Sequence, residues 1–340
     1  MQRRLTSIFQ YIIFLGGGLF LVWWQLKSMT APEKKEFYES ISHANYWVVI
    51  PIALMSILSH VSRSMRWKIL MEPLGYKPRL INVFGVTMIG YLANAAIPRL
   101  GELLKCTFLA KYEKLKVDKL VGTIIVERSF DLICYVVFIG ITILIQINLI
   151  GGYFESKFTS LTVDKGSSLL IKFTIIFLLL AFFTLSMKWL VRKFPKNKLI
   201  VLLNTFIKGV LEGFRTIKQL KKRKQFLMHT IFIWAMYLLQ IYAGFSGLEG
   251  TSGLHINAAF SVLTLATLSM IITPGGIGSF PIFVMQTLLI YGIHAPLGKA
   301  FGWVMWGVST GLIVVVGLIS LIALPSLNKN SLVKSETPLD

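Results

Sequence analysis

Long apolar stretches, interrupted by short basic segments, constrain this chain more than any other feature of its sequence. A helix needs roughly 20 apolar residues to cross the hydrocarbon core of a bilayer. Six stretches reach or approach that length: residues 8–25, 46–62, 120–148, 169–191, 227–247 and 301–324. Apolar residues make up 55% of the chain and charged residues only 15%, which excludes an ordinary soluble domain. The sequence therefore predicts an all-α polytopic membrane protein with about six spanning helices.

Two further apolar regions are broken by proline and glycine. Residues 83–97 run into the segment PRLGE, and residues 257–273 run into PGGIG. Such a break frees backbone groups that lipid cannot hydrogen-bond, so it survives at membrane depth only where protein or a wet cavity surrounds it. We interpret the regions 83–115 and 257–293 as re-entrant hairpins. Their predicted turns contain Pro98, Gly101, Pro274, Gly275, Gly276 and Gly278.

The 35 Lys and Arg residues are distributed unevenly between the predicted loops. The loops assigned to the cytoplasm hold 26 of these residues, and the loops assigned to the outside hold 6. The cytoplasmic loops are residues 1–7, 62–82, 98–119, 192–226 and 325–340. This is the positive-inside pattern of membrane proteins, whereas a nucleic-acid binder gathers its cations on a soluble fold. We expect a multi-pass protein of the plasma (inner) membrane, with both termini cytoplasmic and no nucleic-acid partner.

The order of predicted elements is the same in the two parts of the chain. Residues 1–150 and residues 166–324 each read span, span, hairpin, span. Three crossings per half is an odd number, so the second half is predicted to be inverted relative to the first. Inverted repeats with broken helices at corresponding places are typical of transporters. Chance similarity in a chain of many helices is the alternative. Residues 1–324 are then one transmembrane domain, and residues 325–340 a short cytoplasmic tail.

Charged residues inside an apolar span indicate a functional site or a structural ion pair. Glu127, Arg128 and Asp131 lie within residues 120–148, where each ionised side chain costs about 3 kcal/mol to insert. Their three- and four-residue spacings let them crowd onto neighbouring faces of one helix. They either form an internal salt bridge that locks helix packing, or line a polar cavity that contacts a charged substrate.

Arg99, Glu102 and Lys105 follow the first helix break at three-residue intervals, on one face of the returning half-helix. The N–H groups and positive dipole end of that half-helix favour an anion, and a guanidinium beside them favours phosphate. The alternative is that Arg99 pairs with Glu127 or Asp131 and that no ligand enters.

His60, Arg63 and Trp67 share a face at the end of the second span, with Arg66 beside it. Arg and Trp at a cytoplasmic boundary are typically interfacial anchors, although they can also receive an incoming lipid headgroup. The two cysteines and five histidines show no metal-ligand spacing, and no strand precedes the glycines of the second hairpin. We therefore expect no metal and no cofactor.

At these residues the sequence resembles the flippase-like membrane family that includes the transmembrane half of lysylphosphatidylglycerol synthase. The matching pieces, in chain order, are Arg63-Ser64-Met65-Arg66-Trp67, Pro98-Arg99-Leu100-Gly101-Glu102, Glu127-Arg128 with Asp131, and Thr273-Pro274-Gly275-Gly276-Ile277-Gly278. The resemblance implies an inner-membrane protein associated with moving lipids between leaflets, with these residues lining the lipid path. The synthase also has a large soluble domain, for which residues 325–340 leave no room, so we expect no synthase activity.

We therefore expect a lipid translocase, and not an enzyme, for a phosphate-bearing lipid, either a phospholipid or a polyprenyl-linked one. The candidate substrate-binding residues are Arg63, Arg66, Arg99, Glu102, Glu127, Arg128 and Asp131. The expected partners are membrane lipids with an anionic or phosphate-bearing headgroup, and an envelope protein is a further candidate. Two alternatives stay open: a small-anion transporter, and a membrane-embedded transferase on a lipid-linked substrate that uses Glu127 and Asp131 for acid/base work.

Overall fold

A computed structural model of the protein describes residues 16–97, 99–146 and 216–329, which contain helices and turns and no strand. They fall into two compact units, Met1–Glu127 with Gln219–Asp340 and Arg128–Lys218. Residues 16–27 are helical, in agreement with the second part of the predicted span 8–25. The predicted span 169–191 and Pro98 lie outside the described residues.

Four of the predicted spans appear as helices long and apolar enough to cross a membrane. They are Tyr46–Leu74, α6 (Val117–Ile145), α10 (Arg223–Phe245) and α13 (Ala295–Leu327), and the first combines η1 (Tyr46–Val48), α3 (Val49–Met71) and η2 (Glu72–Leu74). The sequence predicts an end near residue 62 for the first of these because charged residues begin there. The helix continues because Arg63 and Arg66 turn inward and are buried.

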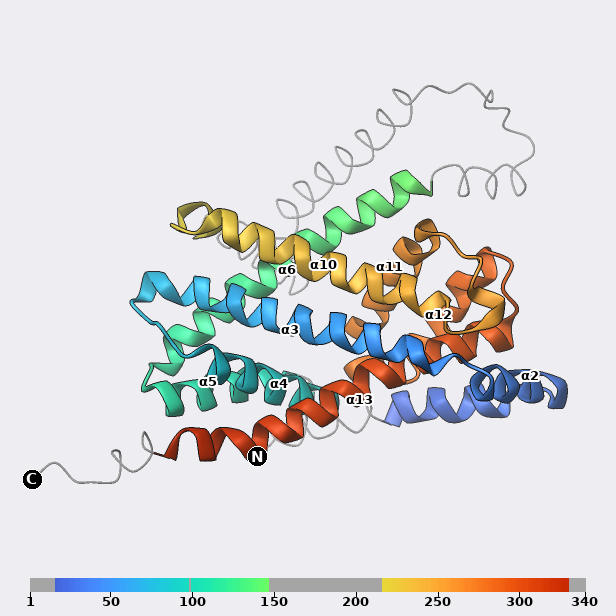
Figure 1. The fold of residues 1–340 in the computed structure, drawn as a ribbon, viewed down its shortest axis with the longest axis horizontal. Coiled ribbons are helices and arrows are strands. Elements are labelled where there is room, and N and C mark those ends of the chain that lie inside the picture. Colours follow the sequence, from blue (N-terminus) through green and yellow to red (C-terminus); the bar gives the residue numbers. More distant parts are fainter. Residues whose placement is uncertain (1–15, 98, 147–215, 330–340) are drawn as a thin grey trace, which may run out of the picture. The chain divides into compact units, whose positions relative to one another are not determined.

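Helices α3 and α10 lie side by side and run in opposite directions (Figure 1). At one end the Lys222 ammonium lies 2.6 Å from a Glu72 carboxylate oxygen. At the other end the Asn45 backbone N–H donates to the Gly247 carbonyl at 2.8 Å. These two contacts fix the antiparallel register of the pair.

The first predicted hairpin is two helices, α4 (Leu80–Ala96) and α5 (Leu100–Glu113), that cross closely. Arg99, between them, has a left-handed backbone with φ of 68°. A Cβ added to Gly101 would overlap the Gly90 carbonyl oxygen, and the Gly101 N–H donates to Asn94 Oδ1 at 2.8 Å. Glycine at position 101 therefore lets α5 return against α4.

The second predicted hairpin consists of α11 (Ile256–Ile272), η4 (Pro274–Gly276) and α12 (Ser279–Ile290). Gly275, Gly276 and Gly278 all have positive φ, which L side chains rarely adopt. Side chains from elsewhere hold this turn, because Trp306 Nε1 donates to the Gly275 carbonyl at 2.8 Å and Gln25 Nε2 to the Gly278 carbonyl at 2.7 Å.

The two series of helices match in length and in the form of their breaks. Helices α3 and α10 both have 23 residues, and α4 and α11 both have 17. Both α4 and α11 end at a residue with extended backbone, Ile97 or Thr273, directly before a proline. Gly275 also lies against Ala95 in the last turn of α4, so the two breaks are neighbours.

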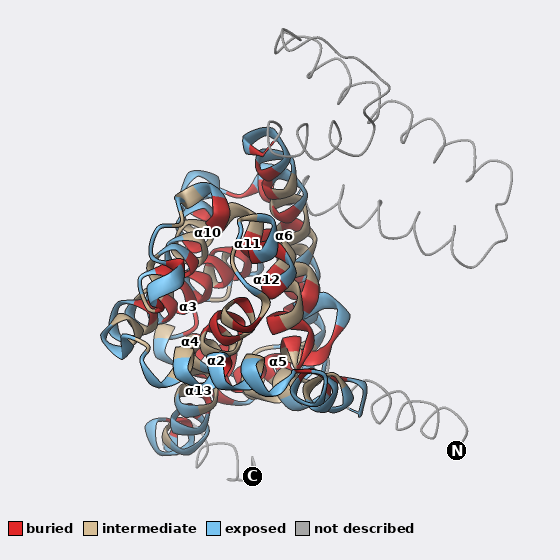
Figure 2. Ribbon diagram, turned by 90° about the vertical axis from the view of Figure 1, so that its right-hand side faces the viewer, coloured by how far each residue is buried: buried red, intermediate tan, exposed pale blue. Residues whose placement is uncertain are grey.

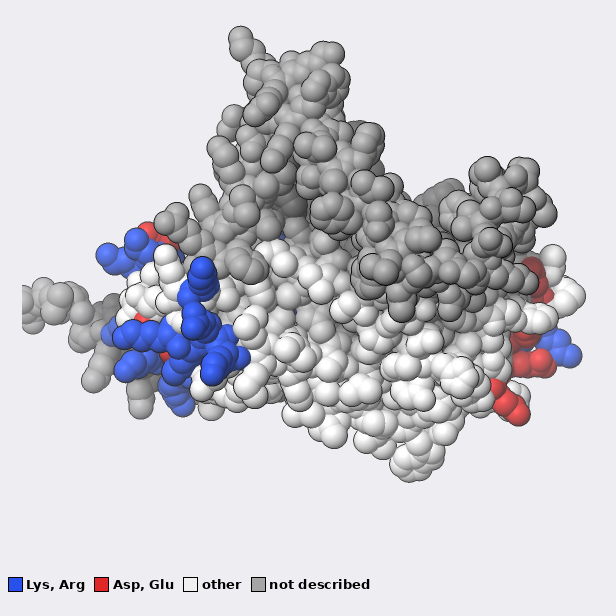
Figure 3. Space-filling view, turned by 90° about the horizontal axis from the view of Figure 1, so that it is seen from above, with Lys and Arg blue, Asp and Glu red and all other residues white. Residues whose placement is uncertain are grey.

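The outward faces of the helices are mainly apolar, and most exposed charges lie near the helix ends. Buried residues lie on the facing sides of the helices in Figure 2, while large apolar side chains such as Leu54, Ile231 and Ile322 are exposed. Figure 3 shows Lys and Arg gathered mainly at one end and a smaller group of charged residues, several of them Asp or Glu, at the other. Apolar sides between two charged ends are what a bilayer requires.

A short helix that the sequence analysis did not predict, α2 (Ala31–Ser42), lies in a segment assigned outside the membrane. It begins with a capping box, in which the Glu33 N–H donates to Thr30 Oγ1 and the Thr30 N–H donates to the Glu33 carboxylate at 2.7 Å. The Thr30 backbone N–H, with the Thr30 hydroxyl, holds the pKa of the exposed Glu33 below its ordinary value of 4.5.

We predict that Gly101→Ala destabilises the protein, because the added methyl group meets the backbone of α4, which cannot turn aside. Overpacking of this kind costs roughly 1–3 kcal/mol, or more where backbone must move. The melting temperature in detergent measures the loss. Gly122→Ala is the control, because a Cβ at that helical position meets nothing within 4 Å. Equal melting temperatures for the two variants would contradict the close crossing.

We predict that the first turn of α2 frays as the pH falls. Because the pKa of Glu33 is lower in the folded helix than in an unfolded chain, its contribution is complete above pH 4.5 and is lost as the pH falls through the lower folded value. The protection factors of the backbone amides of residues 33–36, which correct the exchange rates for their intrinsic dependence on pH, should fall over that range. Glu33→Gln should abolish the pH dependence, and a variant that kept it would place its origin elsewhere.

Candidate functional site

The carboxylate of Glu127 is the centre of a buried charged cluster. Its oxygens lie 3.4 Å from Arg63 Nη1, 3.4 Å from Arg66 Nη2 and 3.2 Å from Lys105 Nζ. The side chains of Glu127 and Arg66 are 0% exposed. We call these four residues the Glu127 cluster.

The four residues of the Glu127 cluster come from three helices. Arg63 and Arg66 are three residues apart on α3, so they project from one face. Lys105 comes from the returning helix α5, and Glu127 from α6. The cluster therefore depends on the chain turning back after the first break.

Aromatic and hydroxyl side chains hold the cations in place. Lys105 Nζ lies 3.9 Å from the centroid of the Trp67 ring, a cation–π contact. The buried indole of Trp67 is itself fixed, because its Nε1 donates to Thr123 Oγ1 at 2.8 Å. From α10, Thr230 accepts from Arg66 at 3.2 Å and the Tyr237 hydroxyl accepts from Arg63 at 3.4 Å.

The charges in the cluster indicate what it can do chemically. One carboxylate is shared among three cations at 3.2–3.4 Å, so these four residues carry more positive than negative charge. Two guanidinium forks and an ammonium are also the donors that bind phosphate oxygens most strongly. A phosphate can therefore compete with the Glu127 carboxylate for these donors.

The structure brings together Arg63, Arg66 and Glu127 from the predicted set of site residues. The interpretation of Arg63 and Arg66 as interfacial anchors is wrong, because both side chains are buried and paired with Glu127. The sequence analysis placed Lys105 on the returning half-helix but left it out of the candidate substrate-binding residues. The signal was its position two turns after the break, where a buried lysine needs an anionic partner.

Arg99 and Glu102 lie outside the Glu127 cluster. Arg99 is exposed and makes no ion pair with another described residue of its unit, while Glu102 is partly exposed. Lys105, and not Arg99, pairs with Glu127 from this half-helix. One N–H of the α5 N-terminus is also taken by Asn94, so the helix end offers an anion fewer donors than its sequence suggests.

Arg128 and Asp131 belong to the second unit and pair with each other. Arg128 Nη1 lies 3.9 Å from Asp131 Oδ2, and the two side chains are 42% and 16% exposed. The distance is long and the arginine is in part exposed, so this pair is weaker than the contacts of Glu127.

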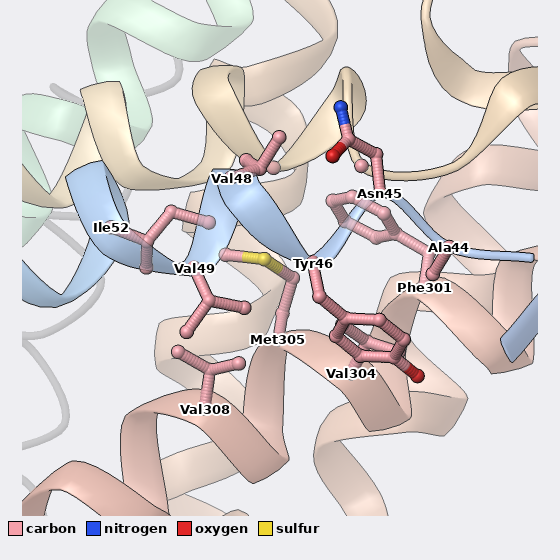
Figure 4. A pocket seen from close by; sticks show the side chains of 12 residues that line it. Ala44, Asn45, Tyr46, Val48, Val49, Ile52, Phe301, Val304, Met305 and Val308 are labelled. Carbon is pink, nitrogen blue, oxygen red and sulfur yellow. The ribbon is translucent and has the colours of Figure 1, made fainter. Parts of the chain in front are cut away.

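A small crevice lies at the other end of α3 and is lined mainly by apolar side chains, including Val49, Ile52, Phe301 and Met305 (Figure 4). Its volume is about 300 Å³, a figure that includes the open space at its mouth. None of its lining residues is charged, so it does not have the chemistry to bind a charged headgroup.

We predict that Glu127→Leu lowers the free energy of unfolding by about 3–5 kcal/mol, because three cations then lose a buried partner. Adding Arg66→Met should recover part of that loss. Denaturant unfolding in detergent measures both. Arg128→Met, at the next position of the same helix, should cost no more than about 1 kcal/mol. Similar losses for Glu127→Leu and Arg128→Met would mean that the cluster is not a strong interaction.

Comparisons with known proteins agree with the resemblance in the sequence. The UPF0104 membrane protein MJ1595 of Methanocaldococcus jannaschii is 30% identical over 93 residues, which is 26% of this chain and 28% of that protein. The similar region thus spans little more than a quarter of that relative's length. The search of solved structures finds no match. The family described as the lysylphosphatidylglycerol synthase TM region matches residues 7–324, nearly the whole chain. The chain is therefore a multi-pass membrane protein that belongs to the lysylphosphatidylglycerol synthase transmembrane-region family.

Proposed function

We propose that this protein is a lipid translocase that binds the phosphate of a lipid headgroup in the Glu127 cluster. The single observation that carries the proposal is the convergence of Arg63, Arg66 and Lys105 on one buried carboxylate, among helices apolar enough to cross a membrane. Buried cations at membrane depth are costly and are typical of substrate pathways. The headgroup enters the polar cluster while the acyl or polyprenyl tails remain in the bilayer.

In this mechanism the phosphate and the Glu127 carboxylate exchange places. When the headgroup arrives, its oxygens accept hydrogen bonds from the Arg63 and Arg66 guanidinium groups and from the Lys105 ammonium. When the headgroup leaves, Glu127 again compensates the three cations. No covalent bond forms or breaks, so the proposal assigns no enzymatic activity and no cofactor.

We further propose that α4–α5 and α11–α12 are re-entrant hairpins in an inverted repeat of residues 1–150 and 166–324. The equal lengths of α3 and α10 and of α4 and α11 support it, as do the proline breaks that follow α4 and α11. Rocking of one half against the other then exposes the site to each side in turn. In this proposal the basic end of the helices faces the cytoplasm of an inner membrane, and both termini are cytoplasmic.

The remaining predicted residues take supporting roles in this proposal. Arg99 is exposed at the first break, where its guanidinium attracts the phosphate before the headgroup reaches the buried cations. Its left-handed backbone is strained for a residue with a side chain, a feature that clusters at functional sites. Glu102, on the same helix as Lys105, adjusts the charge along the path.

Lipid flipping in proteoliposomes tests the proposal. Arg66→Gln should lower the flipping rate of a labelled phosphate-bearing lipid at least tenfold, because one hydrogen bond to a charged group contributes roughly 1.5–3 kcal/mol. Lys222→Gln is the control, since it removes an equal charge from an exposed ion pair at the end of α10.

Equal rates for Arg66→Gln and Lys222→Gln would remove the Glu127 cluster from the mechanism. Uptake of radiolabelled inorganic phosphate without lipid flipping would instead support a small-anion transporter.

A further inference from the structure

Oxygen atoms gather at the second helix break, between the end of α11 and the start of α12. The Thr273 hydroxyl oxygen lies 2.6 Å from the Ser279 hydroxyl oxygen and 3.3 Å from the Ile277 carbonyl oxygen. The Ser279 hydroxyl oxygen also lies 3.1 Å from the Ser269 carbonyl oxygen. The side chains of Ser269, Thr273 and Ser279 are buried. We call Ser269, Thr273, Ile277 and Ser279 the second-break site.

The second-break site has more acceptors than hydrogens. Three of its oxygen–oxygen contacts fall within hydrogen-bond distance, whereas its two hydroxyl groups in these contacts supply one hydrogen each. At least one of the three contacts therefore lacks a hydrogen. The Ser269 carbonyl oxygen also accepts the Thr273 N–H at 3.0 Å, so the backbone already uses part of its capacity.

The backbone of the break adds further acceptors. Pro274 has no N–H, so the Met270 carbonyl loses the partner that a continuing helix would give it. The Gly276 N–H donates to the Thr273 carbonyl at 3.0 Å and so does not extend the helix. The carboxyl end of α11 also carries the negative end of its helix dipole. Both features favour a cation at this end of α11.

Gln25, from the helix at residues 16–27, gives an independent indication of a ligand. Its side chain is 2% exposed, and its Nε2 donates to the carbonyl of Gly278, the residue before Ser279, at 2.7 Å. Its Oε1 is buried and has no hydrogen-bond partner among the described residues. Buried polar atoms are nearly always paired, so an acceptor left over at this turn indicates a ligand that donates or carries positive charge.

We propose that the second-break site, together with Gln25 Oε1, binds a small monovalent cation, Na⁺. Its ligands are neutral hydroxyl, carbonyl and amide oxygens, whereas proteins hold Ca²⁺ and Mg²⁺ largely with carboxylates. The close spacing of the oxygens suits Na⁺ better than the larger K⁺. Unwound backbone and half-helix carboxyl ends coordinate Na⁺ in transporters with broken helices. The sequence analysis expected no metal from the spacing of Cys and His, and these ligands are of neither type.

A cation at this position holds the turn that touches the first break. Gly275 lies against Ala95 in the last turn of α4, since a Cβ added to it would be 3.6 Å from Ala95 Cα. Helix α4 leads into α5, which carries Lys105 to the Glu127 cluster. Binding of Na⁺ is thereby linked to the half-helix that supplies one of the three cations. This link to transport rests on the proposed function, whereas the cation site does not.

Melting temperatures of the full chain in detergent test the site. They are compared in NaCl, KCl and choline chloride at equal concentrations, so that the anion stays the same. The wild-type protein should melt a few degrees higher in NaCl, and the rise should saturate with concentration, because a ligand that binds only the folded state stabilises it. Ser279→Ala and Thr273→Val should lose the rise, and Thr273→Ser, which keeps the hydroxyl, should retain it.

Thr287→Val is the matched control and should keep the sodium-dependent rise. It removes a buried hydroxyl from the same helix, α12, but this hydroxyl donates to the Phe283 carbonyl of its own helix at 2.7 Å. Each variant is compared with itself in KCl, so a general loss of stability does not enter the result.

The outcomes separate the cation site from the proposed function. If the wild-type protein melts at one temperature in all three salts, or if Ser279→Ala and Thr273→Val keep the rise, the oxygens only brace the turn and the site is overturned. Arg66→Gln should keep the sodium-dependent rise although it loses lipid flipping. Equal rates of flipping by the wild-type protein in NaCl and KCl would overturn the link between Na⁺ and transport.

Discussion

The ion pairs of Glu127 constrain the described structure more than any other interaction. A charge buried at membrane depth is tolerated only when partners surround it, so α3, α5 and α6 must meet at one point. An apolar helix in lipid has little preference for one neighbour over another, because lipid tails are as apolar as leucine. The charged contacts supply the specificity that apolar packing lacks here, and they fix which face of each helix turns inward.

The first helix break is a consequence of the same constraint. Lys105 can reach Glu127 only if the chain reverses after α4, which requires a stop at the end of that helix and a close crossing afterwards. The extended backbone of Ile97 provides the stop, and the absence of a side chain at Gly101 permits the crossing. Asn94 then satisfies the N–H of the buried Gly101, which would otherwise lack a hydrogen-bond partner inside the protein.

Hydrophobic length and proline position predict the elements of this fold well, because both act within one segment. The spans near α3, α6, α10 and α13 and the breaks after α4 and α11 follow from them. The partners of each charge do not follow, because they come from other helices. Arg63 and Arg66 look like boundary residues in the sequence and are buried, and Lys105 finds its partner on α6. Helix α2 was not predicted for a different reason: its capping box is a local signal, but the segment is polar and the prediction relied on apolar length.

The position of the cluster relative to α10 connects binding with movement. Arg63 and Arg66 donate to Tyr237 and Thr230 of α10, and Ser62 lies 2.9 Å from His229 of the same helix. In the proposed inverted repeat, α3 belongs to the first half and α10 to the second, so the cations that we propose hold the phosphate also join the two halves. A headgroup that draws the guanidinium groups toward itself weakens their bonds to α10, and a rocking motion that separates α3 from α10 withdraws Thr230 and Tyr237 from the arginines. A bound headgroup and the α10 acceptors Thr230 and Tyr237 then compete for the same donors, so in this proposal binding favours separation of α3 from α10 and couples a bound lipid to a change in access.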